Sequence, residues 1–531
     1  MSSWVLFEDE HLLVIDKPAG VNTHRVDTHS QEGIYEWVTR LRPECELALL
    51  HRLDKGTSGV LVLGKTELAR RSLTEQLSQR RVQKRYELLV PRDASRPERQ
   101  RCDAKVPTKR KGKPRQQEAE TDFARGELAV GERVELQEAR PRTGRRHQIR
   151  LHAARLGMPI LGDVAYEGPP GARLYLHAAE LRLRHPQSGE LLELRSPRRA
   201  SFSRVLAGSD PSAPSVAALA AHEARAVLLG GPETDSWLWI DRHHDGFPEL
   251  RVERYGDVGR VLRYDTRDAP LPAAWIDALM QQGLRALVEQ RRPRGGGGEQ
   301  AETIAGELSQ ARFEARELGL RYWVDVSASP TSSGLFLDQR ETRRRLLGSD
   351  LSGTTCLNAF AHTGSLSLAA ARAGAETLTL DLSKRYLDWA RENLELNGID
   401  PGEHDFIYGD ALDWMRRLGK KGRRFDTVLI DPPSSSTSGK GRRKRRWVVE
   451  RDLDQVVELG ARLVARGGTL FVSTNLRRMA WERFLELIAG GLRAAGRTAA
   501  VQTATCPLDH RCGAGDPPYL KAAWLRLDDA R

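Results

Sequence analysis

One carboxylate in the first part of this chain has the surroundings of a reacting group. Asp54 follows the basic pair His51 and Arg52 and precedes the turn sequence KGTSG at residues 55–59, after which the apolar run Val60–Leu63 begins. A carboxylate held in a turn at a strand edge, with few acidic neighbours, is a candidate nucleophile or acid and base. The sequence therefore points to a reaction centred on Asp54.

Three more carboxylates end apolar, strand-like runs in the last third of the chain. Asp381, Asp410 and Asp431 each close such a run, and Asp431 is followed by Pro432 and Pro433. Asp381 can accept hydrogen bonds from two ribose hydroxyls, and Asp410 can accept one from an adenine amino group. The set predicts a nucleoside-containing cofactor.

These acids need a sheet that brings their strands together. Residues 351–375 read as a strand, a glycine turn at Gly364 and an Ala-rich helix, and the later strands are again separated by helices. This order predicts a parallel sheet that binds its ligand at the carboxyl ends of the strands. A nicotinamide-binding Rossmann domain has the same layout, but its G-x-G-x-x-G signature is absent.

The elements around Asp54 predict a different kind of sheet. Short β-rich runs at 12–15, 60–63 and 86–90 predict strands of a mixed sheet, and the apolar spacing over 67–77 predicts a helix. Basic side chains gather at 103–117, which we interpret as an exposed loop that either is simply solvated or contacts phosphates. The fold class expected for the whole chain is a multidomain combination of α/β and α+β units.

Length and charge narrow the possible functions. A chain of 531 residues suggests about three domains. The 84 Lys and Arg residues outnumber the 72 Asp and Glu residues, which gives a net charge of +12 and a pI near 9.6 and favours a nucleic acid partner. An Arg-rich proteome would produce the same excess. No apolar run reaches the ~18 residues of a membrane helix and no signal peptide is recognised, so a cytoplasmic protein is expected.

Cysteine usage argues against disulfides and metals. The five cysteines lack the regular spacing of a disulfide framework. Cys506, His510 and Cys512 lie close together, but a zinc site would require a second pair of ligands. No metal is therefore expected.

Composition shifts divide the chain. Residues 207–216, rich in Ser, Pro and Ala, read as a linker. The expected domains are residues 1–206, a middle domain at 217–345 that carries no evident catalytic constellation, and the cofactor-binding domain at 346–531.

Four ordered motifs in the first domain resemble the RluA family of RNA pseudouridine synthases. They are the sequence HRLDKGTSG at 51–59, the KPxG turn within 16–21, the segment RTGRRHQIRLH at 142–152 with two extra residues, and GMPILGD at 157–163. The resemblance implies that Asp54 is the essential catalytic carboxylate and that no cofactor is needed. It also implies that Tyr86 stacks on the base or acts in proton transfer, that Arg150 pairs with Asp54 and keeps it ionised, and that Arg52 helps to hold the place of the flipped-out nucleotide.

The last part resembles a second family. GLFLDQR at 334–340 and N-x-F-x-x-T-G at 358–364, with His362 where Tyr is usual, resemble the RlmI/RlmK group of class I ribosomal RNA methyltransferases. The resemblance covers most of 220–531 and implies S-adenosylmethionine as cofactor and Asp431 as a catalytic residue beside the target base. The implied cofactor-binding residues are Asn358, Phe360, Thr363, Gly364, Asp381, Asp410, Asp431 and Pro432.

The absence of a cysteine thiol from the predicted methyltransferase motifs bears on which base is methylated. Methylation at carbon 5 of a pyrimidine needs a covalent cysteine thiolate. Neither DPPSSS at 431–436 nor TLFVSTNL at 469–476 contains Cys. Guanine N7 is already nucleophilic, so placement in line with the methyl group can suffice. We therefore favour guanine N7, with cytosine 5 as the alternative.

The two resemblances together predict a bifunctional RNA modification enzyme that acts on ribosomal RNA, most simply the 23S RNA of the large subunit. The cationic run 440–446, followed by Trp447 as an aromatic for stacking, would suit an RNA contact, although such runs are also common in solvated loops. A rival hypothesis is a pseudouridine synthase fused to a degenerate RNA-binding module for ribosome assembly. DNA is not expected as a substrate.

Overall fold

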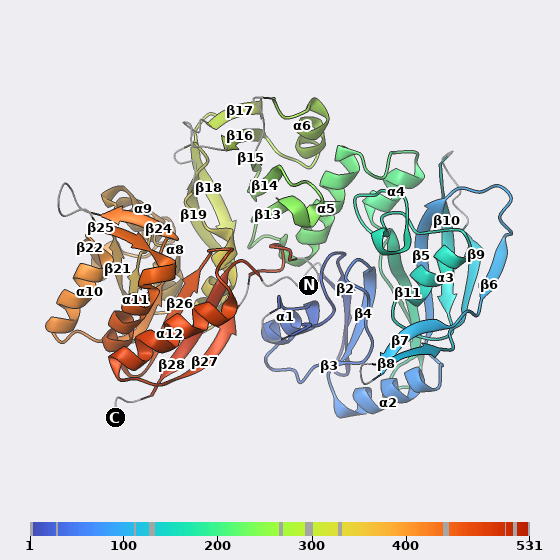
Figure 1. Ribbon diagram of the computed structural model, residues 1–531, viewed down its shortest axis with the longest axis horizontal. Helices are drawn as coiled ribbons and strands as arrows, with labels where there is room; N and C mark the ends of the chain where they lie inside the picture. The colour runs from blue at the N-terminus through green and yellow to red at the C-terminus, as the bar shows by residue number, and fades with distance from the viewer. Residues whose placement is uncertain are drawn as a thin grey trace.

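The computed structural model describes residues 4–27, 30–110, 113–126, 133–264, 269–292, 301–327, 332–438, 445–504, 506–512 and 518–528. Figure 1 shows the amino-terminal domain in blue to cyan on one side, the carboxy-terminal domain in orange to red on the other, and the green to yellow middle domain between their upper parts. In this part of the chain, no helix is both long enough and apolar enough to cross a membrane.

The amino-terminal domain is built on a mixed sheet, as the sequence predicts. The strands follow the order β1-β2-β4-β11-β5-β10-β9-β6, with β3 beside β4 and β12 beside β11, and only β4 and β11 pair in parallel in this described sheet. The strands are β1 (Val5–Glu8), β2 (Leu12–Lys17), β3 (Ala48–Leu49), β4 (Ser58–Gly64), β5 (Gln83–Pro91), β6 (Arg99–Cys102), β9 (Thr121–Arg125), β10 (Val134–Pro141), β11 (Leu176–Arg184) and β12 (Leu191–Arg195). The helices are α1 (Ile34–Leu41), α2 (Glu67–Ser78), α3 (Gln148–Arg155) and α4 (Ala200–Leu206).

The strand that follows Asp54 is fixed by close packing. Every residue of β4 is buried, and Gly59 has a φ of +116°, a conformation that side chains rarely adopt. A Cβ atom on Gly59 would lie 2.2 Å from the carbonyl oxygen of Ala178 in β11. The last glycine of the HRLDKGTSG motif is therefore required for β4 and β11 to pair beside the Asp54 turn.

Two local predictions differ from the structure. The basic stretch at 103–117 is largely a hairpin of β7 (Val106–Arg110) and β8 (Lys113–Gln117) rather than a loop, with Thr108 opposite Arg115. The expected linker 207–216 is shorter, because α5 (Pro214–Leu229) begins inside it and buries Val216. A helix start with Pro at its first position has the same composition as a linker, so composition alone cannot separate the two.

The middle domain packs against both neighbours. Its sheet has the order β13 to β17, and a hairpin of β18 and β19 extends toward the carboxy-terminal domain. Its elements are α5, β13 (Ser236–Asp241), β14 (Leu250–Tyr255), β15 (Val258–Tyr264), α6 (Ala273–Met280), β16 (Ala286–Arg292), β17 (Ala301–Gly306), β18 (Arg312–Glu317) and β19 (Leu320–Asp325). One apolar core joins Trp37 and Leu61 of the first domain to Trp239 and to Leu508 near the chain end.

The carboxy-terminal domain contains the predicted parallel sheet. Its order is β22-β21-β20-β23-β26-β28-β27, in which β22 to β26 run parallel and β28 is antiparallel. The strands are β20 (Thr355–Ala359), β21 (Glu376–Asp381), β22 (Asp405–Tyr408), β23 (Phe425–Ile430), β26 (Val464–Thr474), β27 (Ala499–Ala504) and β28 (Lys521–Leu527), with a separate hairpin of β24 (Ser435–Ser438) and β25 (Arg445–Val448). The helices are α7 (Arg340–Leu347), α8 (Ser365–Arg372), α9 (Lys384–Leu396), α10 (Ala411–Lys420), α11 (Val449–Leu463) and α12 (Trp481–Ala495).

The order of these strands defines where a ligand binds. The chain moves outward from β20 to β21 and β22, then returns to β23 on the other side of β20. At such a reversal the loops after neighbouring strands separate and leave a crevice at the carboxyl ends of the strands. Asp381, Asp410 and Asp431 all lie at this edge, since each is the last residue of its strand or follows it closely.

Candidate active sites

Asp54 lies in a turn that the first domain holds from several sides. The side chain of Thr23 accepts a hydrogen bond from the Leu53 amide and donates one to the Leu53 carbonyl, and the Thr57 amide donates to the Asp54 carbonyl. The Asp54 side chain is 25% exposed, so a substrate can reach it. The turn therefore presents one accessible carboxylate on a fixed backbone.

Basic groups at the start of α3 and just before it face this carboxylate. Arg150 Nη1 lies 3.6 Å from Asp54 Oδ2, and His147 Nε2 lies 3.9 Å from Asp54 Oδ1. Arg150 is fixed by a two-point ion pair with the buried Asp163, at 2.6 and 2.7 Å. The predicted pairing of Arg150 with Asp54 is thus present, but its shorter contacts go to Asp163.

His147 and Asp163 are functional candidates that the sequence argument left without roles. Both belong to motifs quoted from the sequence, but their spacing does not reveal which side chain meets which. His147 adopts a left-handed backbone with φ of +55° and its Nδ1 lies 3.1 Å from the Tyr166 hydroxyl, and this contact directs Nε2 toward Asp54. Burial lowers the pKa of His147 despite the nearby Asp54 charge, so the neutral imidazole is favoured near pH 7.

Tyr86 and Arg52 are the remaining residues that the sequence predicts for the first site. Tyr86 stands on β5 opposite Ala178 of β11, and burial, with the charge of Asp54, raises the pKa of its phenol. It therefore stays a neutral hydroxyl and a flat face for a base. Arg52 is exposed, and within the described part of the chain its side chain forms no ion pair.

The second site begins at the loop between β20 and α8. Asn358 is buried and donates from Nδ2 to Ser367 Oγ at 2.9 Å, while Thr363 donates to the Gly334 carbonyl. Phe360, His362 and Gly364 have positive φ angles of 61°, 50° and 72°. This backbone is tightly turned, and the loop is positioned by buried hydrogen bonds rather than by the sheet alone.

The strand-end acids have the chemistry expected for a nucleoside. Asp381 accepts hydrogen bonds from the backbone amides of His362 and Ser383, both at 2.8 Å, and burial raises the pKa of its carboxyl. Asp410 is half-buried and caps α10 through the Asp413 amide at 3.2 Å. Both carboxylates keep capacity for further hydrogen bonds.

An apolar rim accompanies these acids. Leu382 and Tyr408 are 43% and 52% exposed, and Phe336 is 36% exposed. Large apolar side chains at the surface beside hydrogen-bonding groups suit the faces of an adenine ring. The buried Nε2 of His362 also has no hydrogen-bond partner among the described residues, which leaves a polar atom for a ligand. The residues present therefore fit S-adenosylmethionine.

Asp431 lies in a more enclosed environment than the other two acids. Ser473 Oγ donates to Asp431 Oδ1 at 2.6 Å, and Gln339 Nε2 donates to the same serine at 3.1 Å. Burial raises the pKa of Asp431 to about 6, with a further contribution from the charge of Asp338 and an opposing one from the Ser473 hydrogen bond. Gln339 and Ser473 are further site residues to which the sequence argument assigned no role.

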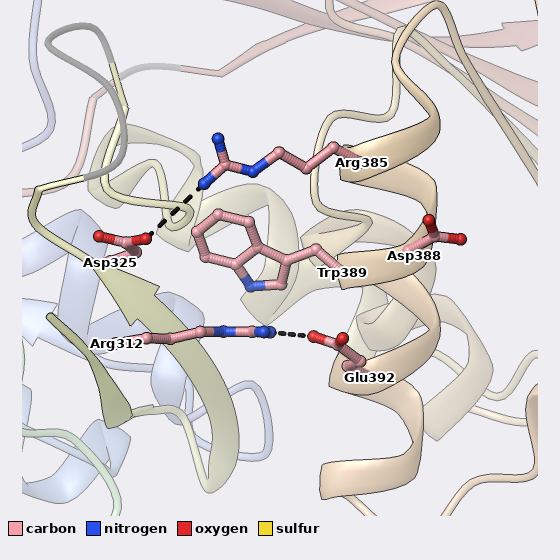
Figure 2. Close-up of a pocket in the computed structure, with 6 residues that line it drawn as sticks. All are labelled: Arg312, Asp325, Arg385, Asp388, Trp389 and Glu392. Carbon is pink, nitrogen blue, oxygen red and sulfur yellow. Dashed lines mark hydrogen bonds and ion pairs between the residues drawn. The ribbon is translucent and has the colours of Figure 1, made fainter. Parts of the chain in front are cut away.

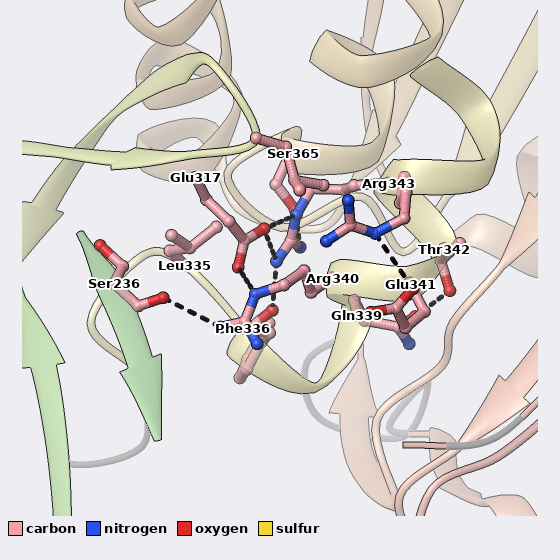
Figure 3. Close-up of polar contacts among 12 residues, drawn as sticks. Ser236, Glu317, Leu335, Phe336, Gln339, Arg340, Glu341, Thr342, Arg343 and Ser365 are labelled. Atoms are coloured by element: carbon pink, nitrogen blue, oxygen red, sulfur yellow. Dashed lines mark hydrogen bonds and ion pairs between the residues drawn. The ribbon is translucent and has the colours of Figure 1, made fainter. Parts of the chain in front are cut away.

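The residue after Gln339 anchors the site to its surroundings. Figure 3 shows that Glu317 from β18 receives hydrogen bonds from both Arg340 and Arg343. Arg340 also donates to Asp509 Oδ1 at 2.7 Å, and all four of these side chains are fully buried. Burying unpaired charges would be costly, so the paired set holds the start of α7, and with it the preceding Gln339, in one place.

Trp447 is not a free stacking surface, contrary to the sequence interpretation. It is 5% exposed, its Nε1 donates to the Pro433 carbonyl at 2.8 Å, and its ring packs 5.9 Å from that of Phe360. Its role is to support the Asp-Pro-Pro loop from behind. The cationic residues 440–444 lie outside the described residues.

One charged cavity lies between the β18–β19 hairpin and α9. It has a volume of about 330 Å³ and is lined by Arg312, Asp325, Arg385, Asp388, Trp389 and Glu392. Figure 2 shows that its charges pair across it, Arg312 with Glu392 and Arg385 with Asp325, around the Trp389 ring. We interpret it as the seam that joins the β18–β19 hairpin to α9. Among the described residues, no three His, Cys, Asp or Glu side chains gather as a metal site.

Comparison with known proteins gives family matches in two separate parts of the chain. Residues 11–155 match the family described as RNA pseudouridylate synthase, and residues 253–497 match the family described as S-adenosylmethionine-dependent methyltransferase. A solved structure described as a putative methyltransferase complexed with SAH superposes with a TM-score of 0.53 at 21% identity, covering 65% of this chain and 87% of that one, which supports the fold.

Curated relatives are similar to about half of this chain. The ribosomal RNA large subunit methyltransferase K of Neisseria meningitidis is 35% identical over 256 residues, which are 46% of this chain and 70% of that protein. A ribosomal RNA large subunit methyltransferase of Deinococcus radiodurans is 31% identical over 327 residues, 59% of this chain and 78% of that protein. The chain spans only 34% of the K/L methyltransferase of Aeromonas hydrophila, with which it is 35% identical.

Proposed function

This chain belongs to the family of ribosomal RNA large subunit methyltransferases, with an RNA pseudouridylate synthase domain at its amino-terminal side, and on that premise we propose that it modifies large-subunit ribosomal RNA at two sites. The first domain converts uridine to pseudouridine, and the last domain methylates guanine at N7. The observation that carries the proposal is the separation of two acid sites, Asp54 with its basic partners and the strand-end acids with their apolar rim. Because the proposed substrate is ribosomal RNA, we infer that both activities act in the cytoplasm.

Pseudouridine formation breaks the bond between the sugar C1′ and the base N1, and then joins C1′ to C5 of the rotated base, which loses its C5 proton. Asp54 acts by attacking C1′ or by removing the C2′ proton. Tyr86, kept as a neutral phenol, lies against the base, while Arg150 and His147 position the Asp54 carboxylate. The exposed Arg52 takes the place of the nucleotide that leaves the RNA stack.

The methyl transfer site would hold S-adenosylmethionine through Asp381 at the ribose and Asp410 at the adenine, with Asn358, Phe360, Thr363 and Gly364 forming the loop beneath. The cofactor supplies an electrophilic methyl group. Asp431 and Pro432 hold the base so that its nitrogen faces that methyl group. An Asp431 carboxylate can accept a hydrogen bond from the guanine amino group.

The cysteines support guanine over cytosine as the target. Cys356 is fully buried in β20, and burial raises the pKa of its thiol to about 12. Burial also raises the pKa of Cys506 well above its ordinary value. Neither thiol can readily become the thiolate that methylation at carbon 5 requires.

The direct test is nucleoside analysis of unmodified ribosomal RNA after treatment with the purified chain. We expect pseudouridine with or without S-adenosylmethionine, and 7-methylguanosine only when S-adenosylmethionine is added. Chromatography with mass spectrometry resolves both products. 5-Methylcytidine instead would refute the argument from the thiols, and loss of methylation alone would favour a degenerate module.

Methyl transfer should depend on pH through Asp431. Because the pKa of Asp431 is raised to about 6, the carboxylate is protonated below that pH and charged above it. We expect single-turnover methylation to rise with pH through about 6 and then level off. Between the ordinary pKa of 3.8 and about 6, the folded protein keeps a proton on Asp431 that the unfolded chain has released. The contribution of Asp431 to stability therefore decreases as pH rises through this interval.

Asp431→Asn is the variant that assigns this pH dependence. It removes the titrating group, so the acidic limb should disappear and the plateau rate should fall by roughly 10- to 100-fold. Asp413→Asn, at an exposed carboxylate of α10, serves as the control that retains the limb. An unchanged acidic limb in Asp431→Asn would show that another group titrates.

A further inference from the structure

A segment near the carboxyl end of the chain reaches the first active site. Residues 506–512 connect β27 toward β28 of the methyltransferase domain and lie outside both matched family ranges. Gln31 of the first domain donates from Nε2 to the carbonyls of Pro507 at 2.9 Å and His510 at 2.7 Å. Leu508 enters the apolar core that also contains Leu53, the residue before Asp54.

The end of this segment covers the turn next to Asp54. Arg511 Nη2 donates to the Ala19 carbonyl at 3.2 Å, and a Cβ atom on Gly20 would lie 2.6 Å from Arg511 Cζ. Lys55, the residue after Asp54, donates from Nζ to the Cys512 carbonyl. The Arg511 guanidinium therefore packs directly against Gly20. Any side chain at position 20 would displace it.

The covered turn is bonded directly to the catalytic loop. The Gly20 amide donates to the Lys55 carbonyl at 2.7 Å, and the buried Lys17 ammonium donates to the carbonyls of Lys55, Val21 and Pro18. Movement of Ala19 or Gly20 would thus move the backbone of Lys55, and with it the neighbouring Asp54. Lys55, which accepts these hydrogen bonds, is bonded covalently to Asp54, the residue that carries the reacting carboxylate.

The segment 506–512 is itself held in place by ion pairs with the rest of the protein. Arg511 Nη1 pairs with Asp245 at 2.7 Å, and Arg225 pairs with the same carboxylate at 2.6 Å. The neighbouring Asp509 pairs with Arg340 and accepts a hydrogen bond from the Leu238 amide at 2.9 Å. Because these charged groups are buried or nearly so, leaving one unpaired would be costly, and the segment has one well-defined position.

We propose that the segment 506–512 is part of the pseudouridine synthase site, and that Arg511 is a positioning residue that holds the KPxG turn and the Asp54 loop in their reactive arrangement. The inference rests on the proposed role of Asp54. The amino-terminal domain alone lacks this support, so the methyltransferase half contributes structurally to the reaction of the other half. Arg511 acts through Ala19, Gly20 and Lys55 and does not contact the reacting atoms.

The test compares variants of the full-length chain under single-turnover and steady-state conditions. We expect Arg511→Gln to lower kcat for pseudouridine formation by about 10- to 100-fold, since small displacements of a reacting group have effects of this size, while KM for RNA changes less than about twofold. Arg511→Lys, which keeps the charge toward Asp245, should lose less. Methylation by the same preparations should remain at the wild-type rate.

Two further variants separate positioning from folding. Gln31→Ala removes the two contacts on the other face of the segment without leaving a buried charge, and should lower kcat in the same direction. Its effect should not add to that of Arg511→Gln, because both release one segment. Arg462→Gln, which removes an exposed ion pair on α11, is the matched control and should leave both activities unchanged.

The outcomes are distinct. A raised KM with unchanged kcat would make Arg511 an RNA contact and overturn the proposal, as would wild-type kinetics in both Arg511→Gln and Gln31→Ala. If Arg511→Gln does not fold by circular dichroism, the Gln31→Ala kinetics decide. Absence of pseudouridine from the wild-type chain would instead refute the proposed function itself.

Discussion

Replacing Asp54 by asparagine should abolish pseudouridine formation while methylation continues. The variant keeps the size of the side chain but removes the accessible carboxylate that lies near both Arg150 and His147. Loss of a reacting group typically reduces a rate by at least about a thousandfold. The measurement is pseudouridine release from ribosomal RNA by mass spectrometry, with methyl incorporation from labelled S-adenosylmethionine in the same samples.

The control for this variant is Asp93→Asn, an exposed carboxylate of the same domain that caps a local turn through Ser95. It should retain both activities. Pseudouridine formation by Asp54→Asn at more than about a tenth of the wild-type rate would refute the assignment of Asp54. Loss of both activities in folded protein would refute independent chemistry at the two sites.

Replacing Asp381 by alanine should remove S-adenosylmethionine binding. The side chain would no longer accept hydrogen bonds from the ribose, and it would also release the amides of His362 and Ser383 that shape the loop. Hydrogen bonds to a charged group contribute about 1.5–3 kcal/mol each, so the dissociation constant should increase by roughly 100-fold or more. Titration calorimetry with S-adenosylmethionine measures this directly, without any RNA.

Asp388→Ala is the matched control, because it removes an exposed carboxylate from α9, the helix that follows Asp381 in the chain. It should bind the cofactor as the wild type does, and pseudouridine formation should be normal in both variants. Wild-type affinity in Asp381→Ala would show that other residues bind the ribose. No binding by the wild-type chain would favour a degenerate module in place of a methyltransferase.

The sequence by itself determined which residues could react and on which elements they stand. The runs that end in Asp381, Asp410 and Asp431 could be recognised because a buried parallel strand is a continuous apolar run. The turn at Asp54 was equally evident, since Gly56 follows it closely, just before β4 begins. Local patterns of this kind depend only on neighbours along the chain, so periodicity and turn chemistry suffice to detect them.

Only the tertiary structure decided which groups meet. Arg150 and His147 reach Asp54 from about a hundred residues away, and Arg511 reaches Ala19 from the opposite end of the chain. Such contacts depend on how domains pack, which no local spacing encodes. Buried charges are especially hidden, because Arg340, Glu317 and Asp509 have residue types that are almost always exposed and become interior only when folding pairs them.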